Sequence, residues 1–233
     1  MHTLATVESQ SAERDAGHCQ RAQAHVLTRT FGSVRVFRTA PTMEGAATGV
    51  TRESRHMQAL VVYESMFGDS QAIAEAVAAG LSGEMAVNVV EVGAAPASVD
   101  RDVDLLVVGG PTHAFGMSRP ATRDDALTKS EGAGVVSKGD GLREWLDAVH
   151  VELDVPAVAF DTRINKPRVP GSAAHAAQRR LRHIGCSTVA PAESFYVHGT
   201  RGPLVDGEVD RAQRWGRQLL AKLPHPQPGT PAN

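Results

Sequence analysis

Residues 59–71 read ALVVYESMFGDSQ. Within this stretch, the pattern of apolar residues changes from that of a strand to that of a helix. The run Ala59 to Tyr63 is continuously apolar and has the length of a strand, which is typical of a strand covered on both faces of a parallel sheet. From residue 73 to residue 81, apolar side chains recur every four positions, as on one face of a helix. The strand therefore ends, and the helix begins, within the turn Ser65 to Ser70.

This turn has the composition of an anion site. Ser65 and Ser70 offer hydroxyl groups, Gly68 lets the backbone curl toward a ligand, and Asp69 or Ser70 is expected to cap the helix. Free backbone N–H groups at a helix N-terminus favour a phosphate. The turn lacks the lysine of nucleotide-hydrolase loops and the three spaced glycines of a dinucleotide fingerprint. Hydroxyls and amides alone therefore suggest a monophosphate ligand.

A second candidate loop follows another apolar strand. Residues 104–110 form an unbroken strand pattern that leads directly into Pro111. After it, Thr112 and His113 carry groups that can hydrogen-bond the edge of a ring, and Phe115 can stack on a flat heterocycle. In doubly wound sheets, ligands lie at the carboxyl ends of strands where the strand order reverses. We expect this loop to face the phosphate turn there.

Strand and helix patterns alternate along the chain, which predicts an α/β fold with a doubly wound, five-stranded parallel sheet and right-handed crossovers. The strand patterns cover residues 59–63, 86–92, 104–110, 155–161 and, in a last region that Pro191 divides, 187–190 and 193–197. Beyond the first helix, helical patterns cover residues 141–149, 170–184 and 208–223. We expect one helical turn from Ser98 and no regular structure from Ser118 to Asp140.

The chain from Met57 to about Leu223 resembles the flavodoxin-like family. Residues 65–70, Ser-Met-Phe-Gly-Asp-Ser, match the family's Ser/Thr-x-Thr-Gly-x-Thr turn, which wraps the phosphate of FMN, with Phe67 in place of the usual Thr. The resemblance implies strand order 2-1-3-4-5 and FMN as cofactor. It also implies that Gly116 or Gly110 acts as a hinge whose peptide turns to meet the flavin.

The same resemblance implies that three loops contact FMN, the third of them after the fourth strand. The family commonly places a Tyr or Trp in that third loop, and this chain has neither there; Arg163 is expected to stack on the ring or meet its carbonyl edge. The predicted cofactor-binding residues are Ser65, Met66, Phe67, Gly68, Asp69, Ser70, Pro111, Thr112, His113, Ala114, Phe115, Gly116, Asp161, Thr162 and Arg163.

Composition excludes several other classes of protein. The chain has 233 residues and a formal charge of -2, which argues against a nucleic-acid surface. Its two cysteines, Cys19 and Cys186, show no zinc-ligand spacing. No apolar run approaches the roughly 20 residues of a membrane span. The N-terminus carries Glu8, Glu13 and Asp15 and has no sustained apolar core, so it is unlike a secretion signal. We therefore expect a cytoplasmic protein that binds neither nucleic acid nor membrane.

Three regions are expected from residue composition. Residues 1–56 contain too few apolar side chains to build a core and are predicted to be a poorly ordered extension. Residues 57–223 form the flavodoxin-like domain, and residues 224–233 are predicted to be a disordered tail. Met57 directly precedes the first strand, which leads to the hypothesis that translation starts there; the intact mass of the native protein tests it.

No Ser-His-Asp set, catalytic carboxylate pair or reactive cysteine is evident at the expected strand ends. A flavin needs none of these groups, because the redox chemistry belongs to the cofactor. The sequence thus predicts an FMN-binding redox protein, either an electron carrier with a redox partner protein or a small reductase that uses a nicotinamide cofactor. The alternative is a cofactor-free flavodoxin-fold protein with a binding or structural role.

Overall fold

The computed structural model describes residues 56–130, 134–166 and 170–223. Except for His56, the predicted N-terminal extension lies outside these ranges, as does the predicted tail. No helix within the described ranges is long and apolar enough to cross a membrane.

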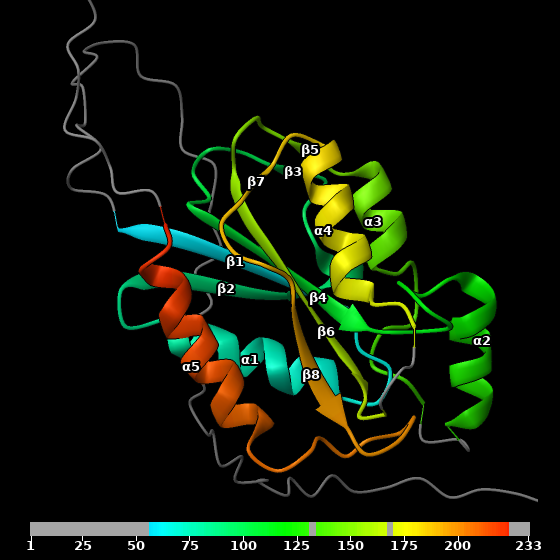
Figure 1. Cartoon of the computed structure of the whole chain (residues 1–233). Helices are drawn as coiled ribbons and strands as arrows, with labels where there is room; N and C mark the ends of the chain where they lie inside the picture. Colours follow the sequence, from blue (N-terminus) through cyan, green and yellow to red (C-terminus); the bar gives the residue numbers. More distant parts are fainter. Residues whose placement is uncertain (1–55, 131–133, 167–169, 224–233) are drawn as a thin grey trace, which may run out of the picture. The chain divides into compact units, whose positions relative to one another are not determined.

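The predicted parallel sheet is confirmed. Its order is β2-β1-β4-β6, and β6 pairs with two short segments, β7 and β8, on its far side; every pair is parallel. This is the expected order 2-1-3-4-5, with the fifth strand divided around Pro191 (Figure 1). The strands are β1 (Met57–Tyr63), β2 (Met85–Glu91), β4 (Leu105–Pro111), β6 (Pro156–Ile164), β7 (Ser187–Thr188) and β8 (Glu193–Val197).

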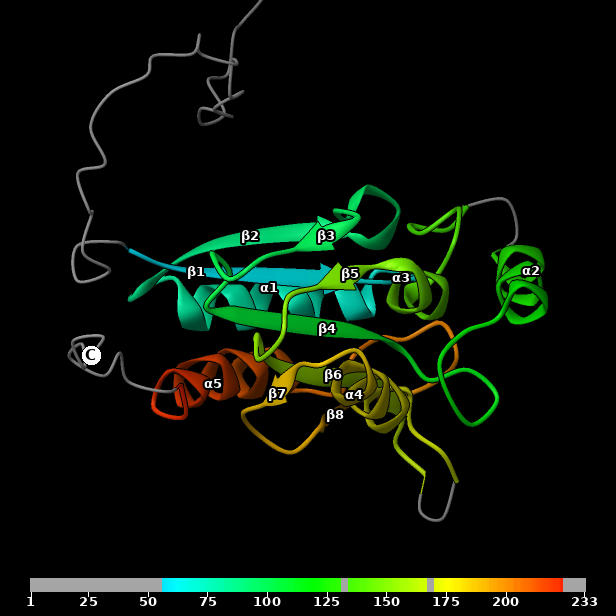
Figure 2. The same cartoon turned by 90° about the horizontal axis from the view of Figure 1, so that it is seen from above.

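Helices cover both faces of the sheet, as a doubly wound fold requires (Figures 1 and 2). In β1, Val61 packs in the core on the side of α1 and α5, whereas Val62 packs in the core on the side of α3 and α4. Both valines are fully buried, which explains why the strand lacks alternating polar residues. The helices are α1 (Asp69–Leu81), α3 (Leu142–Ala148), α4 (Ala173–His183) and α5 (Glu208–Leu220).

Two glycines let α1 and α5 approach closely. A Cβ atom at Gly80 would lie 2.2 Å from the carbonyl oxygen of Gln213, and one at Gly216 would lie 2.4 Å from the carbonyl oxygen of Val77. Neither position has room for a side chain. This crossing fixes the axis of α1 and thus the place of its N-terminal turn.

The expectation of irregular structure from Ser118 to Asp140 is wrong in part, because α2 (Pro120–Lys129) is a helix. Pro120 occupies its first turn, and the hydroxyl of Thr122 accepts from the backbone N–H of Arg119 at 2.9 Å. Within α2 only Ala126 is buried, so the helix carries almost no apolar period. Figures 1 and 2 place α2 beyond the carboxyl end of β4.

The helical turn expected from Ser98 is also wrong. Ser98 and Val99 form β3, which pairs in parallel with β5 (His150–Val151) in a small second sheet. A 3-10 helix, η2 (Val92–Ala94), precedes β3 in the chain. The partner of β3 lies about 50 residues further along the chain, so local pattern alone does not reveal the pairing.

Candidate functional site

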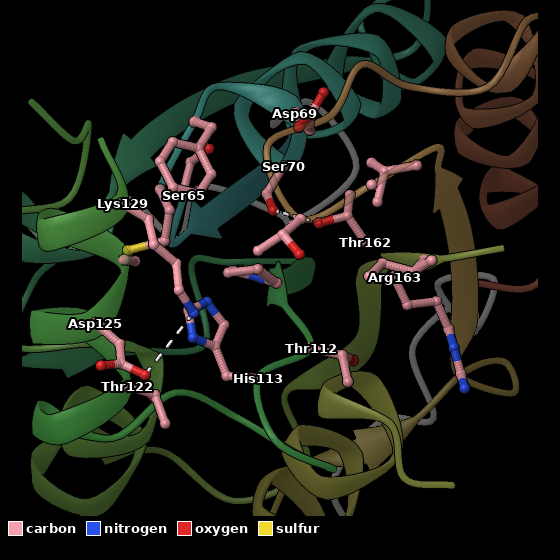
Figure 3. A pocket seen from close by; sticks show the side chains of 18 of the residues that line it. Ser65, Asp69, Ser70, Thr112, His113, Thr122, Asp125, Lys129, Thr162 and Arg163 are labelled. Carbon is pink, nitrogen blue, oxygen red and sulfur yellow. Dashed lines mark hydrogen bonds and ion pairs between the residues drawn. The ribbon is translucent and has the colours of Figure 1, made fainter. Parts of the chain in front are cut away.

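The three predicted loops converge on one cavity of about 310 Å³ at the carboxyl ends of β1, β4 and β6 (Figure 3). This is the place where ligands bind in doubly wound sheets. Four predicted residues, Gly68, Phe115, Gly116 and Asp161, do not line the cavity wall. The predicted residues that do are Ser65, Met66, Phe67, Asp69, Ser70, Pro111, Thr112, His113, Ala114, Thr162 and Arg163.

The first turn of α1 opens toward this cavity without a side-chain cap. Gly68 is the N-cap residue and adopts a left-handed conformation with φ of 98°, so the expectation that Asp69 or Ser70 caps the helix is wrong. The Gly68 N–H donates to Ser65 Oγ at 3.1 Å, which closes the turn. A Cβ atom on Gly68 would meet nothing within 4 Å. The residues on either side of Gly68 line the cavity, so this uncapped start of the helix borders it.

Ser70 connects this turn to the loop after β6. Its Oγ lies 2.7 Å from Thr162 Oγ1, and either hydroxyl can be the donor. Both residues are buried apart from the face that borders the cavity. The bond fixes the distance between the first and the third candidate loop.

Asp161 lies behind the cavity wall and positions the groups around it. It is fully buried, and its Oδ2 atom accepts from Thr112 Oγ1 at 2.8 Å, from Ser172 Oγ at 2.6 Å and from the Ala174 N–H at 3.1 Å. The hydroxyl proton of Thr112 is thus directed to Asp161 and away from a ligand. Asp161 holds the loop after β4 against the start of α4.

The loop after β4 turns back at a two-residue hairpin. His113 and Gly116 exchange backbone hydrogen bonds of 2.8 and 2.9 Å, and the two residues between them have positive φ, 36° at Ala114 and 78° at Phe115. Left-handed conformations cost non-glycine residues about 1–2 kcal/mol each. Phe115 is 66% exposed and lies outside the cavity, whereas Gly110 lies within β4.

His113 forms an uncharged part of the wall. Burial lowers the pKa of its imidazole, and the positive charges of Arg123 and Lys129 lower it further. A hydrogen bond that the ring N–H donates to the backbone carbonyl of Thr122 raises the pKa, but the net shift is downward. The ring is therefore neutral at pH 7. Its contact with Thr122 joins the loop after β4 to α2.

Part of the wall was not predicted, because it belongs to α2, to the last residues of β6 and β8 and to the loop after β8. The α2 residues Thr122, Asp125, Ala126 and Lys129 follow the spacing i, i+3, i+4, i+7, which places them on one helical face. This helical spacing is the sequence feature that could have revealed the face of α2, although only Ala126 of the four residues is apolar. The other unpredicted lining residues are Ile164, Val197, Gly199 and Thr200.

A buried carboxyl group directly precedes the turn at residues 65–70. Glu64 is 1% exposed, and its Oε2 accepts from the Leu142 N–H at 2.8 Å, while Oε1 has no protein partner among the described residues. Burial raises the pKa of Glu64, opposed by hydrogen bonds from Ser118 and Leu142 and by the charge of Arg123. Arg123 Nη1 in turn donates at 3.0 Å to Ser118 Oγ and at 3.0 Å to Glu144 Oε2. This cluster connects the turn to α2 and α3.

No protein-family model matches the sequence, and no curated protein matches it. Solved structures do match the fold. Oxidised flavodoxin 1 from Bacillus cereus has a TM-score of 0.52 at 17% identity, over 72% of this chain and 99% of that one. Oxidised flavodoxin 2 from the same organism has a TM-score of 0.50 at 16% identity, over 71% of this chain and 99% of that one. The chain therefore has a flavodoxin-like fold, as its sequence predicted.

Proposed function

We propose that this protein binds FMN in the cavity at the ends of β1, β4 and β6 and acts in redox chemistry. The observation that carries the proposal is the uncapped first turn of α1, which opens on a cavity bounded by all three predicted loops. The resemblance of residues 65–70 to the family's phosphate turn and the flavodoxin-like fold support it.

The phosphate end of FMN fits the residues present. Gly68 leaves open space before the turn, and Ser65 and Ser70 add hydroxyl groups to the backbone donors. Asp69 follows directly; burial raises the pKa of its carboxyl group, and a hydrogen bond accepted from the Leu204 N–H opposes that rise and holds the carboxyl group in place. The helix dipole adds partial positive charge at this point.

The ring end of FMN fits a partly enclosed site. The cavity volume of about 310 Å³ lies at the small end of the usual range for small-molecule sites. Among the described residues that line it, the aromatic side chains are Phe67 and His113. When bound, the flavin supplies electron or hydride transfer, while Phe67 and His113 orient its ring and exclude water.

The wall formed by α2 favours a small reductase over an electron carrier. A carrier exposes its flavin edge to a protein partner, whereas Thr122, Asp125 and Lys129 extend over this cavity. Such a wall gives a small substrate a pocket beside the ring.

Titration of the purified chain with FMN tests the proposal. We expect one FMN per chain, with quenched flavin fluorescence and a shifted visible spectrum. Riboflavin, which lacks the phosphate, is expected to bind at least about tenfold more weakly, because it loses the charge-assisted hydrogen bonds of the turn. Unchanged fluorescence with both flavins would contradict the proposal, and equal affinity for both would show that the phosphate lies elsewhere.

A cofactor-free binding role is the second candidate. The observation in its favour is that the described loop after β6, through Lys166, contains no aromatic side chain, and that the guanidinium of Arg163 extends away from Ser70 and His113 (Figure 3). A folded protein that remains colourless in excess FMN would support this candidate.

A further inference from the structure

A second hollow adjoins the candidate flavin cavity. It has a volume of about 360 Å³ and is lined by Phe115, Arg163, Gly171, Ser172, His175 and Arg179. Arg163 lines both hollows, so the two share a wall. We call this second hollow the Arg179 groove.

The groove presents an aromatic ring in an unusual position. Phe115 is 66% exposed, and its backbone has φ of 78°. Gly171 permits this arrangement, since a Cβ atom there would lie 2.1 Å from the carbonyl oxygen of Phe115. The chain thus accepts left-handed backbone at Ala114 and Phe115 and displays an apolar ring at the rim, where it is open to stacking.

The groove also gathers arginine and histidine side chains. His175 and Arg179 lie four residues apart on α4 and therefore on the same helical face, and both are exposed. Figure 3 shows the guanidinium of Arg163 extending away from the centre of the flavin cavity. Among the described residues that line the groove, none is acidic. A guanidinium pair beside an aromatic face suits a phosphate monoester attached to a flat base.

The geometry points to the Arg179 groove as the binding site for the adenosine phosphate end of NADPH, with Phe115 against the adenine and Arg163 and Arg179 on the 2′-phosphate. This rests on the proposed function, in which the adjoining cavity holds the flavin. The shared wall at Arg163 makes the two sites contiguous, as a dinucleotide that extends from one to the other requires.

Calorimetric titration of the full chain with 2′,5′-ADP tests the groove without any flavin. We expect saturable binding that is at least about tenfold tighter than that of 5′-AMP, because only the former carries the 2′-phosphate. Arg179→Ala is expected to weaken 2′,5′-ADP binding roughly tenfold by removing a charge-assisted contact. Phe115→Ala is expected to weaken both nucleotides, since both stack on the same ring.

Arg182→Ala is the matched control, because it removes the same charge from the same helix but borders a different hollow. Equal losses in Arg179→Ala and Arg182→Ala would overturn the proposal and indicate diffuse surface charge. Absence of 2′,5′-ADP binding up to about 5 mM in a chain that binds FMN would overturn the groove alone. Nucleotide binding in a chain that does not bind FMN would support the groove and refute the flavin proposal.

Discussion

Ser70 Oγ and Thr162 Oγ1 lie 2.7 Å apart, although 92 residues separate them in the sequence. The contact joins the first turn of α1 to the end of β6, so the candidate phosphate corner is closed by a tertiary hydrogen bond. Both residues border the cavity. A change at Ser70 therefore acts on the ligand and on the junction of two loops at once.

Replacing Ser70 with Asp is expected to lower FMN affinity by at least about 100-fold. Like charges about 4 Å apart repel by roughly 4 kcal/mol at an effective dielectric constant near 20, and a carboxylate here faces the phosphate. Flavin fluorescence quenching measures the change. Ala79→Asp adds the same charge to an exposed position of α1 and is the control; thermal unfolding checks that both variants fold. Unchanged affinity in Ser70→Asp would place the phosphate elsewhere.

Replacing Gly68 with Ala is expected to destabilise the fold by about 1 kcal/mol, because the alanine must adopt positive φ. It should also weaken FMN binding, since the turn relaxes toward other conformations. Gly207 is a matched site: it is the N-cap of α5, has φ of 82°, and likewise has open space where a Cβ atom would lie. Gly207→Ala should lose similar stability in denaturant titrations and keep full FMN affinity. Parallel loss of FMN affinity in both variants would contradict a local role for Gly68.

Glu64→Gln is expected to change the dependence of stability on pH. Burial raises the pKa of Glu64 above its unfolded value, so the folded chain holds more protons than the unfolded chain between those two values. Stability from this group is complete below the ordinary glutamate pKa and is lost as the pH rises through the raised one. The Gln variant lacks this loss, so its stability relative to the parent should increase with pH.

Urea unfolding of both proteins from pH 4 to pH 8 measures this difference. Glu144→Gln is the contrasting variant. Although burial acts to raise the pKa of Glu144, hydrogen bonds from its own N–H, from Gly141 and from Arg123 lower it overall, so its contribution has the opposite sign. Superimposable pH profiles for the parent and Glu64→Gln would rule out a raised pKa at Glu64.

Gly109→Ala is expected to destabilise the protein by roughly 1–3 kcal/mol or more, because the new methyl group overpacks the core. A Cβ atom at Gly109 would lie 2.1 Å from the ring of Phe160, its partner on the neighbouring strand. Gly83→Ala meets nothing within 4 Å and is the control. The midpoint of chemical unfolding measures both. Equal midpoints would mean that the ring of Phe160 moves aside without cost.

Much of the candidate site could be predicted from the sequence, because its loops directly follow apolar strands. Ser70 and Thr112 were assigned from their place after such strands, and both line the cavity. The position of Phe115 outside the cavity could not be predicted from the sequence. It depends on a hairpin with positive φ and on the missing side chain of Gly171, which lets the Phe115 backbone pack against that glycine. Lys129 was missed because α2 has almost no buried face and so no apolar period.

The sequence by itself determined most of the order of strands and helices and the place of the turn at residues 65–70, because unbroken apolar runs and a change in the spacing of apolar residues are local properties of the chain. The tertiary structure alone decided what surrounds the turn. The backbone contact of Gly80 with α5, the buried carboxyl of Glu64 behind the turn and the wall of α2 before it all join residues far apart in sequence. Such contacts depend on close packing between elements, and this packing produces no regular spacing of residues within any one segment.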